Sequence, residues 1–364
     1  MSGARADVGA SGIALIRDLV DWYEGARREL PWRRVRDPYA VWVSETMLQQ
    51  TRVQTVLPYY DRFMSEFPTV LSLAEATEER VLALWSGLGY YRRARMLHAA
   101  AKRLADAHGG RIPRGAADLR QLEGVGRYTA GAIASIAFGE RAPAVDGNVE
   151  RVLSRLFAIA EDPKGARGSA RIWRAAQRLV AKVEGDPGTW NQALMELGAT
   201  VCAPRQPRCT ACPVRKHCRA DQRGIANALP NAKERTPAAT IWRAAVVLVA
   251  RGSVLLARRH THALFGGLWE PPAGEGGVAA VAERLNVDGR TLSAVGEVVH
   301  VLTHRRMRVE VARGALPRRS QWSVPGPEYD AIEVVRVDDL SLRGHSTLAR
   351  KVLILANVTA GGLR

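Results

Sequence analysis

Four cysteines, all that the 364-residue chain contains, follow one another closely with the spacing Cys202-x6-Cys209-x2-Cys212-x5-Cys218. Four thiolates on one short loop suit either a tetrahedral zinc ion or an iron–sulfur cluster. Zinc ribbons usually pair two Cys-x2-Cys knuckles across a longer gap, whereas this loop has only one. The uneven spacing therefore favours a [4Fe–4S] cluster over zinc, with four reduced, unliganded cysteines as the alternative. Cysteines gathered in this way form no disulfide framework, which indicates a reducing compartment.

The periodicity of apolar residues changes once along the chain. From residue 12 to about 200 apolar residues recur every three or four positions, which predicts helices over 41–64, 79–85, 92–110 and 169–183. The polar, proline-bearing segment 223–239 is the best linker candidate. Beyond it, 241–259 reads as a β-hairpin, and further short apolar runs surround one helical stretch at 278–286. The chain is thus expected to hold an all-α domain followed by an α+β domain.

The formal net charge of +17 predicts an anionic partner. Many of the positive charges are arginines, whose planar guanidinium groups suit phosphate. No apolar run approaches the roughly 20 residues needed to span a bilayer. The small, polar N-terminus does not resemble a signal peptide, so a cytoplasmic location without membrane association is expected.

The stretch "LEGVGRYTAG", residues 122–131, joins two helical patterns through a glycine turn. Gly124 and Gly126 would let backbone N–H groups approach a phosphate closely, and the following helix would direct its positive end there. A helix-hairpin-helix phosphate clamp fits this pattern. A dinucleotide-binding fingerprint does not, because no strand precedes the turn. An ordinary glycine cap between packed helices remains the alternative.

Two carboxylates are candidates for acid–base chemistry. Glu45 is the one charged residue of the segment "SETMLQQT". A carboxyl group on an apolar face tends to keep its proton, as a general acid must. The alternative for Glu45 is a helix N-terminal carboxylate that completes a cap at Ser44. Asp146, in "VDGNVERV", is either a routine helix cap or a carboxylate that faces developing positive charge. Together the two would suit glycoside cleavage.

Aromatic and polar side chains next to basic residues form a further candidate surface. Tyr90 and Tyr91 precede a run of arginines, and Gln49 and Gln50 follow the Glu45 segment. Side chains of this kind form wedges that enter a base stack. Two neighbouring tyrosines are more often part of a hydrophobic core, and that alternative stays open.

These motifs, in this order, closely resemble the adenine DNA glycosylases of the MutY family, within the helix-hairpin-helix superfamily that includes endonuclease III. The resemblance runs from about Leu30 to Cys218. It implies a helical catalytic domain over 12–222, with the helix-hairpin-helix at about 116–138 and the iron–sulfur loop at 202–218. A linker over 223–240 and a Nudix-like domain over 241–360 would follow.

The resemblance implies excision of adenine opposite 8-oxoguanine, or guanine, from double-stranded DNA during base excision repair. Glu45 matches the family acid that protonates adenine, and Asp146 matches the carboxylate that stabilises the oxocarbenium ion. Tyr128 would pack beside that cation. In relatives that also cut the strand this position is a lysine, which forms a Schiff base with the sugar. A phenol cannot form an imine, so Tyr128 implies a glycosylase without true lyase activity.

The resemblance also implies residues that bind the DNA. Trp32, Arg33 and Gln192 match the adenine pocket, and Gln50 and Tyr90 match the residues that probe the opposite base and wedge the stack. The [4Fe–4S] cluster would be structural, and the protein is expected to act as a monomer.

The C-terminal domain is similar to the Nudix-like domain with which these enzymes recognise 8-oxoguanine. It lacks the carboxylates of a working Nudix box, so a binding role is expected. Leu302, Thr303 and His304 stand where the family usually has Phe-Ser-His. Thr303 keeps a hydroxyl group, whereas Leu302 loses the aromatic ring and any stacking contact. A surface strand without a special role is the alternative.

Two other functions compete with this interpretation. The first is a bifunctional pyrimidine-damage glycosylase and lyase of the endonuclease III type, which Tyr128 and the Nudix-like domain disfavour. The second is a non-enzymatic iron–sulfur DNA-binding module, which the presence of both Glu45 and Asp146 disfavours.

Overall fold

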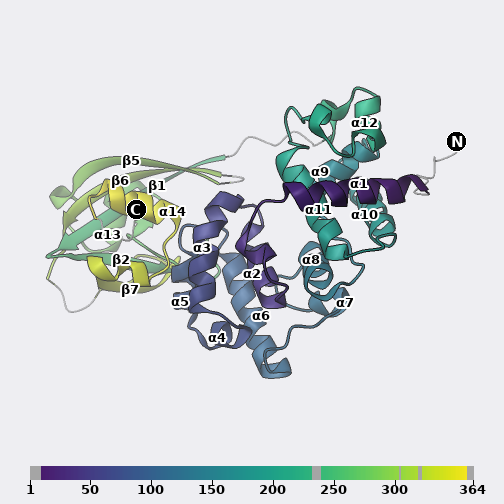
Figure 1. Ribbon diagram of the computed structural model, residues 1–364. Helices are drawn as coiled ribbons and strands as arrows, with labels where there is room; N and C mark the ends of the chain where they lie inside the picture. The colour runs from purple at the N-terminus through teal and green to yellow at the C-terminus, as the bar shows by residue number, and fades with distance from the viewer. Residues whose placement is uncertain (1–9, 232–238, 303–304, 319–321, 359–364) are drawn as a thin grey trace. The chain divides into compact units, whose positions relative to one another are not determined.

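The computed structural model describes residues 10–231, 239–302, 305–318 and 322–358 (Figure 1). The chain divides into two compact units. The first comprises Met1–Gln50 and Arg103–Glu234, and the second comprises Thr51–Lys102 and Arg235–Arg364. Within the described ranges, no helix combines the length and the apolar composition needed to cross a bilayer.

The first unit is helical. Its elements are α1 (Ala10–Ala26), the 3₁₀ turn η1 (Pro31–Arg33), α2 (Pro38–Leu48), α7 (Ala116–Leu119), α8 (Arg127–Phe138), α9 (Gly147–Leu156), α10 (Ala166–Val180) and α11 (Pro187–Thr200). Helix α11 packs against α1, α8 and α9, and its Trp190 is fully buried with Leu19 of α1 in the core. A Cβ atom at Gly198 would lie 3.1 Å from the backbone of Asn148, so a glycine there brings α11 directly against the start of α9.

Short turns follow α11: η2 (Cys209–Ala211), η3 (Arg215–His217), α12 (Arg219–Gln222) and η4 (Ala226–Ala228). Ala226 and Leu229 are buried and pack beside Cys209 and Cys218. The first part of the segment expected to be a linker is therefore folded onto the cysteine loop.

The second unit contains α3 (Val53–Glu66), α4 (Val70–Glu75), α5 (Glu78–Trp85) and most of α6 (Arg92–His108). The single helix expected over 41–64 is wrong. Helix α2 ends at Leu48, and Gln50 adopts a positive φ of 58°, which no α-helix accommodates. Phe63 packs edge-to-face against Phe67 and Trp85 in the core of these helices.

The rest of the second unit is α+β, as expected. Its strands are β1 (Ala239–Ala250), β2 (Ser253–Arg259), β3 (Trp269–Glu270), β4 (Ala273–Gly274), β5 (Ser293–Val301), β6 (Arg305–Ala315) and β7 (Tyr329–Arg336). They form one sheet in the order β3-β2-β1-β6-β5, with β4 paired to β1 and β7 to β2. Strands β1 and β2 form the expected hairpin, and only β1 and β6 are parallel among the pairs in this order.

Both faces of this sheet are covered. Successive residues of β1 point to opposite sides of the sheet, and each side packs in its own core. Ala245 and Val247 pack on one side, in the core that includes α14 (Thr347–Leu355). Ala244 and Val246 pack on the other, in the core that includes α13 (Gly277–Arg284). The turns η5 (Gly289–Thr291) and η6 (Val337–Leu342) complete the domain.

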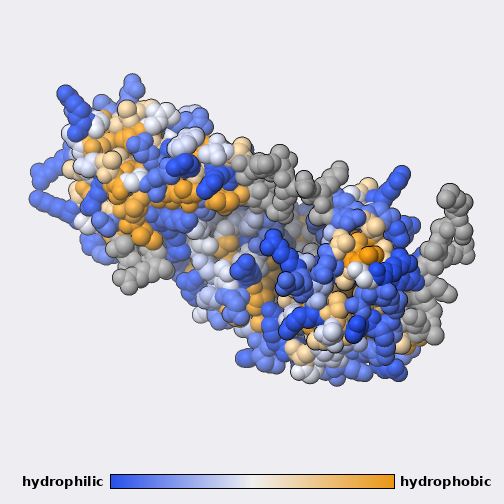
Figure 2. All heavy atoms as spheres, turned by 90° about the horizontal axis from the view of Figure 1, so that it is seen from above, coloured by the Kyte–Doolittle hydropathy of each residue, from blue (hydrophilic) through white to orange (hydrophobic). Residues whose placement is uncertain are grey.

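Hydrophilic residues cover much of the face seen in Figure 2, with hydrophobic residues visible between them. Exposed large hydrophobic side chains in the described chain include Tyr90, Trp242 and Val301. Tyr90 is one of the DNA-contact candidates, and it is 46% exposed rather than part of the core.

Candidate active site

Helix α2 places Glu45 inside the first unit. Asp37 caps the helix by accepting a hydrogen bond from Tyr39 N, and Pro38 occupies the first turn. Ser44 is therefore in mid-helix, where its hydroxyl donates to the carbonyl of Val41 at 2.8 Å, and the interpretation of Ser44 as a cap is wrong. Every residue from 39 to 47 of α2 is buried, so the helix passes through the core.

Glu45 is 5% exposed, and burial raises its carboxyl pKa to about 7. The nearby Asp146 contributes to this rise in pKa, whereas the hydrogen bond from Tyr128 and the charge of Arg33 act against it. A carboxyl group in this environment keeps its proton near neutral pH and can give it to a bound base.

Tyr128 reaches Glu45 from the start of α8. Gly124 adopts a positive φ of 76° and Gly126 is the extended residue before the helix, so the turn directs the chain straight into α8. The hydroxyl of Tyr128 donates to Oε2 of Glu45 and lies 3.5 Å from the sulfur of Met195. Burial, together with the neighbouring carboxylates, raises the pKa of Tyr128 well above 10, so the phenol remains a hydrogen-bond donor.

Asp146 is the cap of α9, as one of the two interpretations predicted. Its Oδ1 accepts from Val149 N and its Oδ2 accepts from the amide of Asn148, both at 2.8 Å. Burial raises the pKa of Asp146, against these hydrogen bonds and the charge of Arg151. These hydrogen bonds fix the direction of the Asp146 carboxylate. The charge of Asp146 also raises the pKa of Glu45, so the two carboxyl groups are electrostatically coupled.

A second cluster of charged groups lies in the same unit and was not found from the sequence. Glu196 of α11 is fully buried and accepts from Arg28 Nε at 2.6 Å, Arg28 Nη2 at 2.8 Å and Arg33 Nη2 at 2.8 Å. Burial raises the pKa of Glu196, but the two arginines outweigh it and the net shift is downward. Arg33 also stacks over Tyr23, whose hydroxyl donates to Gln192 at 3.3 Å.

Trp32 is buried, and it precedes Arg33 in the turn η1. The structure thus brings the candidate adenine-pocket residues Arg33 and Gln192 together around Tyr23 and Glu196. Glu196 follows Gln192 by four positions on α11, so one helical face carries both. That spacing is the sequence signal that relates Glu196 to Gln192, and it does not indicate the partners Arg28 and Arg33.

The glycine turn before α8 is exposed at Gly124 and Gly126, while Val125 between them is buried. Gly126, the residue at the cap position of α8, has no side chain to cap the helix. The first backbone N–H groups of α8 therefore have no partner within the helix, and they lie beside the exposed Arg127.

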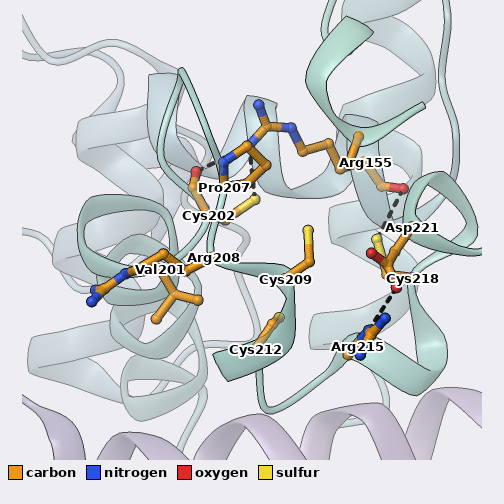
Figure 3. Close-up of a pocket in the computed structure, with 11 residues that line it drawn as sticks. Arg155, Val201, Cys202, Pro207, Arg208, Cys209, Cys212, Arg215, Cys218 and Asp221 are labelled. Carbon is orange, nitrogen blue, oxygen red and sulfur yellow. Dashed lines mark hydrogen bonds and ion pairs between the residues drawn. The ribbon is translucent and has the colours of Figure 1, made fainter. Parts of the chain in front are cut away.

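The four cysteines surround one space, into which Figure 3 shows their side chains directed. All four are half-buried thiols without a disulfide, and burial raises the pKa of Cys212 to about 12. Arg155 is fully buried beside them and donates to Cys202 Sγ at 3.2 Å and to the carbonyl of Ala203 at 2.7 Å. Among the described residues, no three His, Cys, Asp or Glu side chains are grouped closely enough to bind one metal ion.

The remaining DNA-contact candidates belong to different units of the structure. Gln50 ends the first segment of the first unit and is exposed, with a positive φ. Tyr90, in the second unit, also has a positive φ, of 50°, and its ring lies under the guanidinium of Arg93 at 5.3 Å. Thr303 and His304 lie outside the described residues. Leu302 packs against the core of the C-terminal domain.

Comparisons with known proteins identify the family of the chain. The model of the HhH-GPD superfamily of base excision DNA repair proteins matches residues 43–184, and the NUDIX domain model matches residues 243–355. The adenine DNA glycosylase of Rattus norvegicus is 40% identical over 381 residues, which cover 87% of this chain and 73% of the relative. The chain belongs to the adenine DNA glycosylase family. It is a DNA glycosylase that hydrolyses the N-glycosyl bond of adenine in base excision repair.

Other relatives of this glycosylase extend the comparison. The adenine DNA glycosylase of Homo sapiens is 53% identical over 214 residues, which cover 56% of this chain and 39% of that protein. The solved structure of a thermostable thymine-DNA glycosylase is 29% identical with a TM-score of 0.52, and it covers 58% of this chain and 97% of its own. These relatives give the endonuclease III alternative no better support, and the non-enzymatic alternative is wrong.

Proposed function

We propose that this adenine DNA glycosylase removes adenine paired with 8-oxoguanine, and that Glu45 is the acid of the reaction. The buried Glu45, with its pKa raised to about 7, is the observation that carries this proposal. Adenine is a poor leaving group as an anion, and protonation of its imidazole ring turns it into a good one. The adenine must first leave the base stack, because the glycosidic bond is inaccessible within a duplex.

Asp146 stabilises the sugar as its bond to adenine breaks. The sugar then carries the positive charge of an oxocarbenium ion, which a fixed carboxylate favours. The hydrogen bonds from Val149 N and Asn148 hold the Asp146 carboxylate in one direction, so little reorganisation accompanies the charge. The cation itself also favours the ionised form of Asp146 over the protonated form that burial promotes.

Tyr128 supports Glu45 and excludes lyase chemistry. Its hydroxyl orients the Glu45 carboxyl group, and its high pKa keeps it a donor throughout the reaction. A tyrosine at this position offers no amine to form a Schiff base with the sugar. The product is therefore an abasic site in an uncut strand.

The adenine pocket is formed by Trp32, Arg33 and Gln192. The aromatic ring of Trp32 and the amide of Gln192 suit a planar purine with hydrogen-bonding edges. The ionised Glu196 holds Arg33 in place through the 2.8 Å ion pair, so the pocket keeps its shape without a base. Arg28 forms a second ion pair with Glu196, so two guanidinium groups balance the buried negative charge of Glu196.

One feature of the structure suits the DNA backbone, and a second suits the base stack. The exposed Gly124–Gly126 turn and the uncapped start of α8 suit a phosphate, which the helix dipole also favours. Gln50 and Tyr90 are both exposed at positive φ, a conformation that costs energy and is often kept at functional sites. They are suited to probing the opposite base and wedging the stack.

The four cysteines hold a [4Fe–4S] cluster. Their thiols face one space, carry no disulfide and lie beside a buried arginine that compensates negative charge on the thiolates. When bound, the cluster supplies a rigid centre for the loop. Exposed basic residues of the loop, such as Arg205 and Arg208, would then face the phosphates of DNA.

The C-terminal domain recognises 8-oxoguanine instead of hydrolysing nucleotides. Helix α13 carries a single carboxylate, Glu283, which is too few for the magnesium site of a Nudix hydrolase. Thr303 and His304 are the candidates for contact with the lesion. Leu302, which packs inward, leaves lesion recognition to these two residues.

A single-turnover assay tests the proposal. A duplex with adenine opposite 8-oxoguanine is incubated with the cluster-loaded protein, and samples are analysed with and without hot alkali. Strand breaks that appear only after alkali are expected, because they report base excision without lyase activity. Breaks without alkali, or equal rates when guanine replaces 8-oxoguanine, would contradict the proposal.

A further inference from the structure

The turn between α5 and α6, residues 86–91, carries Tyr90 and is conformationally costly. Gly87 and Gly89 have φ values of 100° and 76°, and Tyr90 itself has a φ of 50°. A bulky residue in this region is disfavoured and persists only where its surroundings hold it. The contacts around the turn therefore decide where the Tyr90 ring points.

One set of contacts comes from the helices on either side of the turn. Trp85 Nε1 donates to the carbonyl of Gly89 at 3.1 Å, and Arg93 Nη2 donates to the same carbonyl at 3.2 Å. From α3, the hydroxyl of Tyr59 donates to the carbonyl of Ser86 at 3.1 Å. These bonds are local to the helical part of the second unit.

A second set comes from the C-terminal domain, through the backbone of His345. The hydroxyl of Ser86 donates to His345 O at 2.9 Å and accepts from His345 N at 3.0 Å. The hydroxyl of Tyr91 donates to the same carbonyl at 2.9 Å and accepts from Gly87 N at 3.1 Å. Ser86, Tyr91 and His345 are buried at 7%, 6% and 0% exposure. Water cannot replace these bonds, so breaking them leaves polar groups unsatisfied.

The His345 segment is itself held firmly. Its imidazole lies between the carbonyls of Trp269 at 2.8 Å and Leu340 at 3.0 Å. A Cβ atom at the preceding Gly344 would lie 3.0 Å from Leu82 Cβ of α5, so only a glycine permits this approach. The turn thus rests on a rigid part of the other domain.

Charged contacts extend the same junction. Glu79 of α5 accepts from Trp269 Nε1 at 2.8 Å and from Arg343 at 2.6 Å. Arg95 of α6 donates to the carbonyl of Thr261 at 2.6 Å. The C-terminal domain therefore contacts the helices that both precede and follow the Tyr90 turn.

We propose that the C-terminal domain positions the wedge residue Tyr90, through the hydrogen bonds of Ser86 and Tyr91 to His345. The proposal rests on the wedge role given to Tyr90 under Proposed function. Ser86 and Tyr91 are positioning residues, since they act on DNA only through the direction of the Tyr90 side chain. The lesion-recognition domain thereby acts on the base stack through a turn of the catalytic helices.

The test compares two ways of releasing the same turn in the cluster-loaded full chain. The double variant Ser86→Ala/Tyr91→Phe removes the side-chain bonds to His345, together with the bond that the Tyr91 hydroxyl accepts from Gly87 N within the turn. The control Tyr59→Phe removes a hydroxyl that bonds to the same turn from α3, and leaves His345 untouched. Binding is measured to a duplex with adenine opposite 8-oxoguanine. A 2-aminopurine beside the lesion reports opening of the stack by its fluorescence, and thermal melting of each variant sets an assay temperature at which it is folded.

We expect the double variant to lose about tenfold in duplex affinity and most of the fluorescence increase, while Tyr59→Phe changes affinity less than about twofold. The double variant is also made in a Tyr90→Ala background. There it should cause no further loss, because residues that act through one group are not additive.

Four outcomes would overturn the inference, and they are distinguishable. Equal losses in the double variant and in Tyr59→Phe would mean that any weakening of the turn has this effect. The same loss with and without Tyr90 would mean that the bonds serve only stability. If Tyr90→Ala alone leaves affinity and fluorescence unchanged, the wedge role fails and the positioning role fails with it. A loss in Tyr90→Ala without a loss in the double variant would remove the positioning role alone.

Discussion

The hydroxyl of Tyr128 donates a hydrogen bond to Oε2 of Glu45, across 83 positions of the chain. One residue starts α8 directly after a glycine turn, and the other lies in the buried helix α2. Helices α2 and α8 pack together, which brings an acid and its orienting donor into one place. The bond lowers the pKa of Glu45 against the larger effect of burial.

Tyr128→Phe should shift the pH dependence of adenine release to higher pH. Without the phenol hydrogen bond, burial and Asp146 act on Glu45 with less opposition, so its pKa rises and the protonated acid survives further into the alkaline range. The maximal rate should fall only about fivefold, the effect of one hydrogen bond. Single-turnover rates from pH 5 to 9 measure both changes. Tyr60→Phe, at a buried tyrosine of α3, is the matched control, and an unshifted profile in Tyr128→Phe would argue against the role of this bond.

Asp146→Asn should strongly slow turnover while the fold remains. Asparagine caps helices about as well as aspartate, so the unfolding free energy should change by less than about 0.5 kcal/mol. Loss of the negative charge next to the oxocarbenium ion should slow adenine release by about 10²–10³-fold. Single-turnover rates measure the loss of adenine release. Duplex affinity and urea unfolding are the controls for binding and for the fold. A variant as active as the parent would refute the assigned role.

Tyr128→Lys should introduce strand cleavage. A lysine at this position offers an amine to the sugar carbon, and the resulting Schiff base permits elimination. Strand breaks should then appear without alkali, and borohydride should trap a covalent protein–DNA adduct. Tyr128→Met, similar in length but without an amine, is the control and should give neither. Trapping by the methionine variant would show that another amine does the chemistry.

Glu196→Gln should destabilise the first unit. The substitution puts a neutral, fully buried amide beside the half-exposed Arg28 and the mostly buried Arg33. Because solvent partly screens Arg28, the loss should cost about 2 kcal/mol of unfolding free energy. Glu29→Gln, at the exposed ion pair with Arg34, should cost less than about 0.5 kcal/mol. Urea unfolding monitored by tryptophan fluorescence compares the two. Equal effects would mean that the buried cluster adds no specific stability.

Helix positions, the hairpin and the Asp146 cap were predictable from the sequence, because each depends on residues that are close together in the chain. The helix at 79–85 and the hairpin at 241–259 lie within a residue or two of α5 and of β1 with β2. Asp146 precedes its helix in a sequence that favours caps, and the structure has that cap. Glu45 was recognisable because it is one carboxylate in an apolar segment.

Features that depend on distant contacts were not predictable in this way. Glu196 bonds to Arg28 from 168 positions away, and no periodicity links the two. Ser44 looked like a cap because Asp37 and Pro38, which really begin α2, stand seven and six residues earlier. The bonds of Ser86 to His345 join residues 259 positions apart. Such pairs are set by the packing of whole elements, which a single sequence does not encode locally.

The pH dependence of adenine release tests the role of Glu45 most directly. A buried acid with a pKa of about 7 is protonated at pH 6 and mostly ionised at pH 8. Single-turnover rates should therefore fall as the pH rises through 7, by about tenfold for each pH unit beyond it. Glu45→Gln, which keeps the shape of the side chain but not its acidity, should be slower by about 10²–10⁴-fold and show no such fall. A wild-type rate that stays constant or rises from pH 6 to 9, or a Glu45→Gln variant that matches it, would contradict the assignment of Glu45 as the acid.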